Sequence, residues 1–414
     1  MDAAPSPKTI VVVGAGIVGT ACAHFLRRDG HDVTVVDPLE PGDGTSFGNA
    51  GVIATSEVAP IAMPGLLRQV PRMLADPNGP VVVRWRYLPK IAPWLFELVK
   101  ATRRADAIAA ALAPLLAEAE GAHDALAREA GAADLYRKPG WLKLYSSERA
   151  FAEAAAEISF MRRYSVRYEV LESEEIRELE PALAPIFRRA IFHPDCGFVR
   201  NPKRLTERVA RSFLEKGGRI LREKALRFDL GEGRRAVLTE KGRHAAEVIV
   251  LAAGAWSRPL ALSLGARVPL DTERGYHAML EPPEPALSRP VYWDDHHFIL
   301  APMEHGLRLT SGVEFAGLEA PPDYRLLDRL IGFAKRMLPS LKGEPRSRWL
   351  GFRPSLPDSL PVLGRSGKHE GVYFAFGHQH LGLTLSAISG RIIADLVAGR
   401  DPGIDLSPYR AERW

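Results

Sequence analysis

A Gly-x-Gly-x-x-Gly motif at residues 14–19 constrains this chain more than any other feature. The β-branched run Ile10–Val13 precedes it and predicts a buried strand. Thr20–Asp29 follows and predicts a helix, and His31–Asp37 predicts a second strand that ends in an acid. The order strand, glycine-rich turn, helix, strand is that of a parallel βαβ unit.

The spacing of this motif suits a dinucleotide. Gly14 permits a tight turn, Gly16 lets the backbone approach a pyrophosphate, and Gly19 lets helix and strand pack closely. The start of the helix offers free N–H groups to phosphates. Asp37 can accept hydrogen bonds from a ribose and would repel a 2′-phosphate, which argues against NADP. The motif alone leaves NAD and FAD open.

Three further segments favour FAD. The small and polar loop 45–51 can bring backbone amides to a second phosphate or to a flavin ring. The strand and turn at 250–256 mark the point where a flavin domain resumes. The loop 377–384 runs into a predicted helix, Leu385–Ala398, whose N-terminus can stabilise negative charge on a reduced flavin.

Composition narrows the class of protein. The chain has 414 residues, 46% of them hydrophobic, which suffices for two or three folded domains. The net charge of +5 comes from dispersed basic residues, so we do not expect nucleic-acid binding. We find neither a secretory signal nor a long apolar span, and we expect a cytoplasmic protein. Peripheral contact with the inner face of a membrane remains open.

The remaining segments predict a second unit. Residues 38–65 read as an extended loop, and residues 90–135 as helices. Alternating runs at 141–145 and within 275–315 predict an antiparallel sheet. Single helices are expected over Glu148–Tyr164, Asn201–Lys216 and Asp323–Leu338.

The motifs VVVGAGIVG (11–19), VVDP (35–38), SFGNAG (46–51), VLAAGAWS (250–257), GFRPSLPDSLPVLG (351–364) and FGHQHLGLTLSAISG (376–390) occur in this order. With them the chain resembles the FAD-dependent D-amino-acid oxidase/dehydrogenase superfamily, and within it the bacterial D-amino-acid dehydrogenases. Family members commonly have Glu at the ribose position, where this chain has Asp37. The stretch 274–277 and the segments 306–317 and 377–384 look most similar to members that oxidise D-proline-type or D-hydroxyproline substrates.

The resemblance implies an α/β (α+β overall) fold. A glutathione-reductase-like Rossmann domain for FAD would comprise residues 1–55, 195–270 and 345–414. A substrate domain, built on an antiparallel sheet with flanking helices, would comprise 56–194 and 271–344. The residues expected to bind FAD are Gly14, Gly16, Ile17, Val18, Gly19, Asp37, Pro38, Ser46, Asn49, Ala50, Gly51, Ala225, Ala253, Gly254, Trp256, Gly351, Arg353, Gly377, His378, His380, Leu381, Gly382, Leu383 and Thr384.

Arg353 is the first candidate for substrate binding. A guanidinium binds a carboxylate through two parallel hydrogen bonds. In the resembled family an arginine in this Gly-x-Arg-Pro context holds the substrate carboxylate. The alternative is a structural ion pair with Asp358.

Four more residues are candidates for the site. The Tyr276 hydroxyl could make a second bond to the carboxylate, and His277 could contact substrate or flavin; ordinary strand packing is the alternative for both. His378 and His380 could donate to the flavin or contact substrate near working pH.

We expect no metal site. The pair His378 and His380 has no evident third ligand, and the cluster 294–297 reads as a polar turn at the substrate entrance. Cys22 fits the core of the first helix. No cysteine follows Cys196, so we expect FAD to bind without a covalent link.

The resulting hypothesis is an enzyme that transfers a hydride from Cα of a D-amino acid to flavin N5, with D-proline or D-hydroxyproline favoured. A quinone or another carrier would accept the electrons, and the oligomeric state stays open. The alternatives are an O₂-using oxidase of the glycine or sarcosine type that releases hydrogen peroxide, a non-catalytic flavin protein, and an NAD-dependent dehydrogenase.

Overall fold

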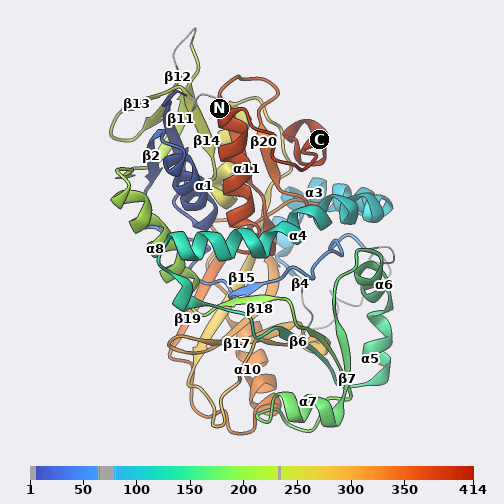
Figure 1. The fold of residues 1–414 in the computed structure, drawn as a ribbon. Coiled ribbons are helices and arrows are strands. Elements are labelled where there is room, and N and C mark those ends of the chain that lie inside the picture. Colours follow the sequence, from blue (N-terminus) through green and yellow to red (C-terminus); the bar gives the residue numbers. More distant parts are fainter. Residues whose placement is uncertain (1–5, 64, 66–78, 80, 232–234) are drawn as a thin grey trace.

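The computed structural model describes residues 6–63, 65, 79, 81–231 and 235–414. Residues 1–5 and 232–234 of the expected FAD domain therefore lie outside the described residues, as do residues 64, 66–78 and 80 of the expected substrate domain. The described chain forms two large sheets, one in the upper and one in the lower half of Figure 1.

The upper sheet has six strands. Its order is β10-β2-β1-β14-β21-β20, and every pairing is parallel except that of β20 with β21. The motif strand β1 lies near the middle, which explains its continuous apolar run, because both faces of such a strand are buried. The bounds are β1 Thr9–Val13, β2 Asp32–Asp37, β10 Arg219–Arg222, β14 Val248–Leu251, β20 Val362–Arg365 and β21 Val372–Phe376.

Alternate residues of β1 face two different cores. Ile10 and Val12 pack in the cluster that holds α1 (Ile17–Arg28), α11 (Ser386–Ala398) and α4 (Ala105–Glu129). Val11 and Val13 pack in the cluster on the opposite face. That face is covered by the small antiparallel sheet β11 (Ala225–Asp229), β12 (Arg235–Thr239) and β13 (Arg243–Ala246), and by α9 (Ser257–Ser263).

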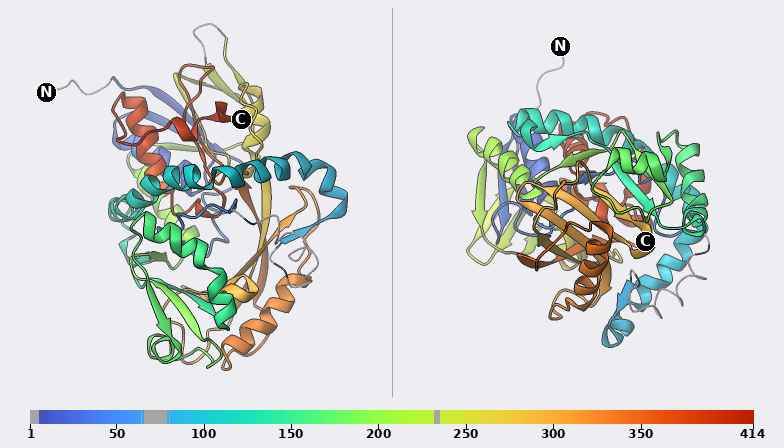
Figure 2. Two further views of the ribbon diagram at one scale, coloured as in Figure 1. Left: turned by 90° about the vertical axis from the view of Figure 1, so that its right-hand side faces the viewer. Right: turned by 90° about the horizontal axis from the view of Figure 1, so that it is seen from below.

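Helix α4 crosses the molecule between its two halves (Figure 1). It contacts α11 and α8 (Pro202–Glu215). Helix α3 (Leu88–Ala101) lies at the margin of the molecule in both views of Figure 2. No helix among the described residues is both long and apolar enough to cross a membrane.

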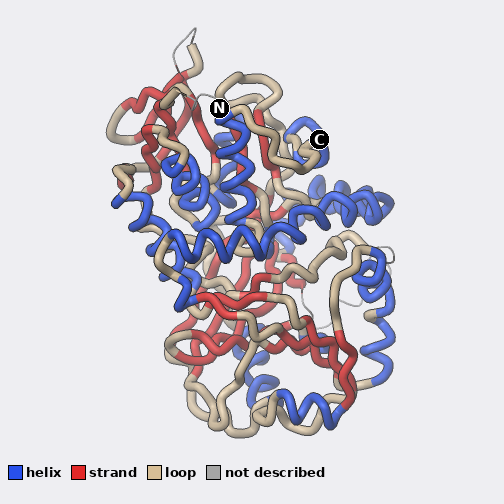
Figure 3. Tube along the Cα trace, viewed as in Figure 1, coloured by secondary structure: helices blue, strands red, loops and turns tan. Residues whose placement is uncertain are grey.

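The lower sheet has nine strands in the order β19-β15-β18-β17-β16-β6-β8-β7, with β4 paired to β18. Its pairings are antiparallel except β16 with β6 and β18 with β4. Figure 3 shows these strands gathered inside the lower half, with helices at its margin. The bounds are β4 Val81–Val83, β6 Trp141–Tyr145, β7 Glu169–Glu172, β8 Arg189–His193, β15 Asp271–Leu280, β16 Val291–Trp293, β17 Phe298–Met303, β18 Gly306–Phe315 and β19 Ser347–Ser355.

One face of the lower sheet packs on α10 (Arg325–Met337), whose Leu327, Leu330 and Ile331 join the core there. Strand β19 belongs to this sheet, although its sequence stands in the segment expected to bind FAD. A small third sheet joins β3 (Val52–Ile53), β9 (Gly197–Val199) and β5 (Tyr136–Arg137).

The expected fold class is confirmed, with local differences. The first helix begins at Ile17 rather than Thr20, because Gly16 already serves as its N-cap. The single helix expected over Glu148–Tyr164 is two helices, α5 (Glu148–Glu153) and α6 (Ala155–Arg163). A third short helix, α7 (Ser173–Leu179), precedes β8. His297 has φ +52° and ends a turn before β17 instead of starting the strand.

Candidate functional site

A cavity of about 1140 Å³ extends from the glycine-rich turn of the upper sheet across to one face of the lower sheet. Of the residues expected to bind cofactor, those that line it are Gly14, Gly16, Ile17, Val18, Asp37, Pro38, Ser46, Asn49, Ala50, Ala225, Ala253, Gly254, Trp256, Gly351, Arg353, His378, His380, Gly382 and Leu383. The fold thus brings together most of the residues that the sequence nominated.

The other residues expected to bind FAD do not line the cavity but pack next to residues that do. A Cβ on Gly19 would lie 2.0 Å from the Gly14 carbonyl oxygen, so Gly19 serves helix–strand packing as expected. Gly51 packs against β9, and Leu381 lies in the core. The Thr384 hydroxyl accepts a hydrogen bond from Ala54 N at 3.0 Å. Gly377 has φ +82°, a conformation that favours glycine.

The glycine-rich turn forms a cradle that a side chain would fill. Gly14 has φ +116°, and a Cβ there would meet the Ala252 carbonyl oxygen at 2.4 Å. Gly16 lines the cavity, and the nearest atom to a Cβ on it is Ser46 Oγ at 3.5 Å. The start of α1 therefore presents bare backbone to the cavity, as a pyrophosphate requires.

Asp37 stands at the end of β2 beside this turn. Its carboxylate accepts hydrogen bonds from Ala15 N at 2.7 Å and from Leu39 N at 2.8 Å. Burial raises the pKa of Asp37, and these two backbone bonds partly oppose the shift. An acceptor group thus lies within the cavity wall at the position expected for ribose binding.

The loop 45–51 is fixed from two sides. Ser46 Oγ accepts a hydrogen bond from Ile17 N at 3.0 Å, and the Thr45 hydroxyl donates to the Phe352 carbonyl at 2.8 Å. The buried Arg308 donates to the carbonyl oxygens of Phe47 and Asn49 at 3.0 and 2.6 Å. Burial lowers the pKa of Arg308 to about 10, so it keeps its charge at neutral pH. The sequence reading missed Arg308; its only signal was a charge inside an apolar strand pattern.

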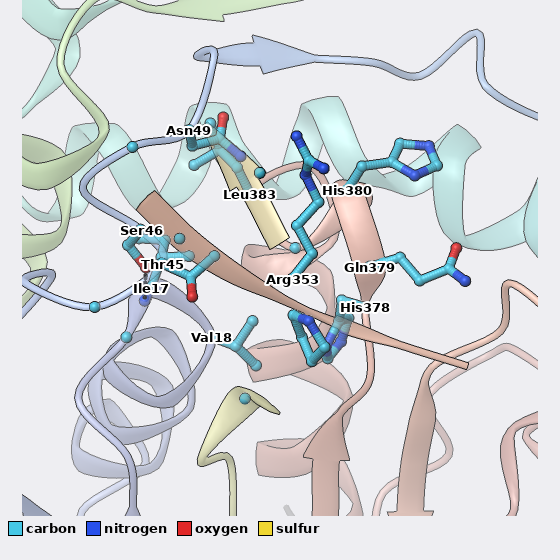
Figure 4. Close-up of a pocket in the computed structure, with 18 of the residues that line it drawn as sticks. Ile17, Val18, Thr45, Ser46, Asn49, Arg353, His378, Gln379, His380 and Leu383 are labelled. Carbon is cyan, nitrogen blue, oxygen red and sulfur yellow. Dashed lines mark hydrogen bonds between the residues drawn. The ribbon is translucent and has the colours of Figure 1, made fainter. Parts of the chain in front are cut away.

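Arg353 lies on β19, and its guanidinium faces the cavity on the side away from Ser46 and Ile17 (Figure 4). Its Nη1 donates to the Gly312 carbonyl at 2.8 Å. The strand pairing shifts by one residue here, and Gly312 in this bulge has φ +50°, which aims its carbonyl at Arg353. Burial lowers the pKa of Arg353, and the negative charge of Glu273 partly opposes this.

The alternative role for Arg353 is excluded. Asp358 pairs with Arg413 instead, at 2.7 Å. Among the described residues, Arg353 has no carboxylate within 4 Å. Glu273 lies close enough for its charge to act on Arg353 but does not pair with it directly. The cavity therefore holds a half-buried guanidinium that forms no salt bridge with a described residue.

His380 lies at the same end of the cavity as the Arg353 guanidinium (Figure 4). Desolvation in the cavity, then the charge of Arg353, lowers the pKa of His380 to about 4, although the side chain stays accessible, so the ring is neutral at pH 7. His378 also borders the cavity, but its Nε2 is hydrogen-bonded to Ser389 of α11 at 3.0 Å. Between them, Gln379 adopts φ +49°, an uncommon backbone conformation for a residue with a side chain.

Tyr276 and His277 lie on opposite faces of β15. Tyr276 faces the α10 side, where its hydroxyl donates to Glu314 at 2.6 Å and accepts from Asp323 N at 3.1 Å. Strand alternation places residue 276 on the face opposite Gly275 and Arg353, yet Tyr276 also lines the cavity, so its expected contact with a carboxylate stays a prediction. His277 faces the cavity side but is covered: its ring stacks on Trp349 at 5.0 Å. Burial, then Arg308, lowers the pKa of His277 to about 3.

The cavity continues across the lower sheet through residues that the sequence reading did not nominate. One register row runs from β15 to β6 on the cavity face: His277, Thr310, Ile299, Tyr292 and Lys143 lie opposite one another in successive strands. The last four of them line the cavity, as do Glu57 and Trp141. Non-local strand pairing creates this row, so no local motif announces it.

Both cysteines, Cys22 and Cys196, are free and buried, and neither lines the cavity. Within the described ranges, no group of three or more His, Cys, Asp or Glu side chains is placed to hold a metal ion.

Comparison with known proteins agrees with this geometry. Residues 9–396 match the family model DAO, described as "FAD dependent oxidoreductase". A protein named D-amino-acid oxidase from Bradyrhizobium diazoefficiens is 37% identical over 99% of this chain and 100% of its own length. One named D-amino acid dehydrogenase from Paramagnetospirillum magneticum is 31% identical over 98% of each chain.

Solved structures share the fold. The structure of glycine oxidase from Geobacillus kaustophilus matches with a TM-score of 0.79 at 22% identity, over 99% of both chains. That of L-proline dehydrogenase from P. horikoshii matches with a TM-score of 0.77 at 20% identity, over 99% of this chain and 98% of the other.

Proposed function

The chain belongs to the DAO family of FAD-dependent oxidoreductases, and on that premise we propose that it dehydrogenates a D-amino acid to the imino acid. The observation that carries the proposal is the half-buried Arg353 guanidinium, which shares one cavity with the glycine-rich turn and forms no salt bridge among the described residues. A substrate carboxylate supplies that partner. The names of the two relatives support the choice of D-amino acids.

We assign binding of the cofactor and binding of the substrate to different residues of the cavity. The turn 14–18 and Asp37 would hold the pyrophosphate and ribose of FAD, and the loop 45–51 would border its flavin. When bound there, FAD would supply the acceptor for the hydride from Cα. Gly382 and Leu383, on the turn before α11, border the cavity where a helix N-terminus stabilises negative charge.

Arg353 orients the substrate, and His380 contacts its amine. Two hydrogen bonds from the guanidinium would fix the substrate carboxylate. This limits rotation of the substrate and would keep its Cα–H directed toward the flavin. The neutral His380 ring can accept a hydrogen bond from the amine, because its lowered pKa keeps a nitrogen lone pair free at pH 7. A strong protein base is then not required, because the hydride leaves Cα while the amine is neutral and its lone pair forms the C=N bond.

The sequence resemblance to enzymes of D-proline and D-hydroxyproline adds both compounds to the substrates to be tested. The electron acceptor is a separate question. We propose a quinone or another carrier; O₂ is the second candidate, because the Bradyrhizobium relative is named an oxidase.

Anaerobic reduction of the flavin tests the proposal. The purified holoenzyme is mixed with both enantiomers of alanine, lysine, norleucine and proline, with the hydroxyprolines, and with glycine and sarcosine. We expect bleaching of the flavin band by D-amino acids and not by their L-enantiomers. Bleaching only by L-amino acids, or only by glycine and sarcosine, would refute the proposal. Aerobic turnover with stoichiometric hydrogen peroxide would assign O₂ as acceptor.

A further inference from the structure

The far end of the cavity is a lobe bordered by Glu57, Trp141, Lys143, Tyr292, His297 and Ile299. It begins beyond Gly312, the residue of β18 that contacts Arg353, and extends over β17, β16 and β6. With neighbouring strands about 4.8 Å apart, Tyr292 on β16 lies roughly 10 Å from Gly312 across the sheet. The lobe therefore starts where the carboxylate clamp ends and is deep enough for a long, unbranched side chain.

The charges around the lobe do not balance. Lys143 Nζ is 2.5 Å from Glu157 and 3.3 Å from Asp294, so two carboxylates already share its single positive charge. These two acids outweigh the effect of burial and keep the pKa of Lys143 well above its ordinary value. Glu57 adds a third carboxyl group to the same neighbourhood.

Glu57 is the acid without a partner. Its carboxylate makes no hydrogen bond and no ion pair within 4 Å among the described residues, and Glu57 lines the cavity. Burial, then the negative charge of Glu157, raises the pKa of Glu57 to about 7, although Lys143 opposes the shift. Asp294 adds to it. A positive charge placed in the lobe would relieve this crowding of acids.

We propose that the lobe selects D-amino acids whose side chain ends in a positive charge, such as D-lysine and D-arginine, and that Glu57 binds that cation. The inference rests on the proposed function. It narrows the substrate from any D-amino acid to the basic ones, which a pyrrolidine ring such as that of D-proline does not match. Trp141 and Tyr292 contribute aromatic surface to the stem of the side chain.

D-Lysine and D-norleucine provide the test, because they differ at the terminal amine. In anaerobic stopped-flow reduction at pH 8, we expect D-lysine to exceed D-norleucine in the ratio of rate constant to dissociation constant by roughly tenfold or more. Glu57→Gln should abolish most of this preference, measured as the ratio between D-lysine and D-norleucine for each variant. Glu57→Asp should retain part of it. Glu344→Gln, an exposed acid outside the cavity wall, is the matched control.

A binding measurement gives a second readout. 6-Aminohexanoate and hexanoate carry the same carboxylate but differ in the terminal charge, and neither has an α-amine to oxidise. Calorimetric titration of the holoenzyme should show tighter binding of 6-aminohexanoate, and Glu57→Gln should remove the difference. A melting curve of each variant establishes that it is folded.

The outcomes separate the two proposals. Reduction by D-alanine and D-norleucine with no advantage for D-lysine or D-arginine would overturn this inference and leave the proposed function standing. So would an advantage that survives Glu57→Gln. Failure of every D-amino acid to reduce the flavin would overturn the proposed function and this inference with it.

Discussion

The Arg353 guanidinium lies over Gly275, two positions along β15 from Glu273, the residue that pairs with Arg353: a Cβ atom on residue 275 would come within 2.5 Å of the Arg353 Cζ. The glycine therefore leaves room for the guanidinium to reach from its own strand to the Gly312 carbonyl on β18. The first prediction concerns this contact.

Gly275→Ala should displace the guanidinium and weaken substrate binding. Because the methyl group occupies the place of Cζ, we expect KM to rise roughly tenfold or more through the loss of charge-assisted bonds, with FAD content unchanged. Steady-state kinetics and the flavin spectrum measure both. Gly121→Ala, at a helix position with open space around its Cβ, should leave KM unaltered. An unchanged KM in Gly275→Ala would contradict the role of this contact.

Arg353→Lys should keep the charge and lose the two parallel hydrogen bonds. The expected cost is about 1.5–3 kcal/mol, or roughly 10- to 150-fold in KM, with FAD still bound. The control Arg346→Lys alters an arginine whose partner, Glu281, is half-exposed at the surface, and should leave KM as it is. The carboxylate-clamp assignment would not survive a normal KM in Arg353→Lys.

Gly14→Ala should impair FAD binding before it impairs catalysis. A side chain at φ +116° is strained, and its Cβ would overlap the Ala252 carbonyl. We expect the turn to shift and the purified protein to contain substoichiometric flavin, as measured by the ratio of absorbance at the flavin band to that of protein. Gly332→Ala, where a Cβ meets nothing within 4 Å, should retain full flavin content. Full flavin content in Gly14→Ala would argue against the cradle.

Glu57 should make stability depend on pH. Its pKa is about 7 in the folded protein and 4.5 when exposed, so the folded state binds the proton more tightly. The associated stabilisation is present below pH 4.5 and is lost as the pH rises through 7. Glu57→Gln mimics the protonated acid, so its melting temperature should exceed that of the wild type above pH 7 and approach it near pH 4.5. A difference independent of pH would disprove the raised pKa.

The βαβ unit follows from the sequence because the motif, both strands and the acid are consecutive. The choice of FAD follows from the later segments 45–51, 250–256 and 377–384. The sequence also nominates Arg353, because its Gly-x-Arg-Pro context consists of four consecutive residues. The sequence does not say which face of a strand meets the cavity. On β15 that choice decides between Tyr276, which turns to Glu314, and Gly275, which makes room for Arg353.

Glu57 and Lys143 illustrate a second reason why part of the site could not be predicted from the sequence. They are separated by more than eighty positions in the chain and come together only because β6 joins the lower sheet while the segment after β3 passes over it. Neither stands in a motif. Their relation depends on strand order, which short sequence patterns do not encode, so the part of the site that recognises a side chain emerges only from the folded chain.

The register row across the lower sheet has a consequence for how such an enzyme changes during evolution. Each strand contributes one side chain to the row, while the hydrogen bonds between strands involve only the backbone. A single replacement at Ile299 or Tyr292 would therefore shorten or deepen the lobe by about one strand width and leave Arg353 untouched. New substrate lengths are accessible in single mutational steps, each with the reacting carbon held in place.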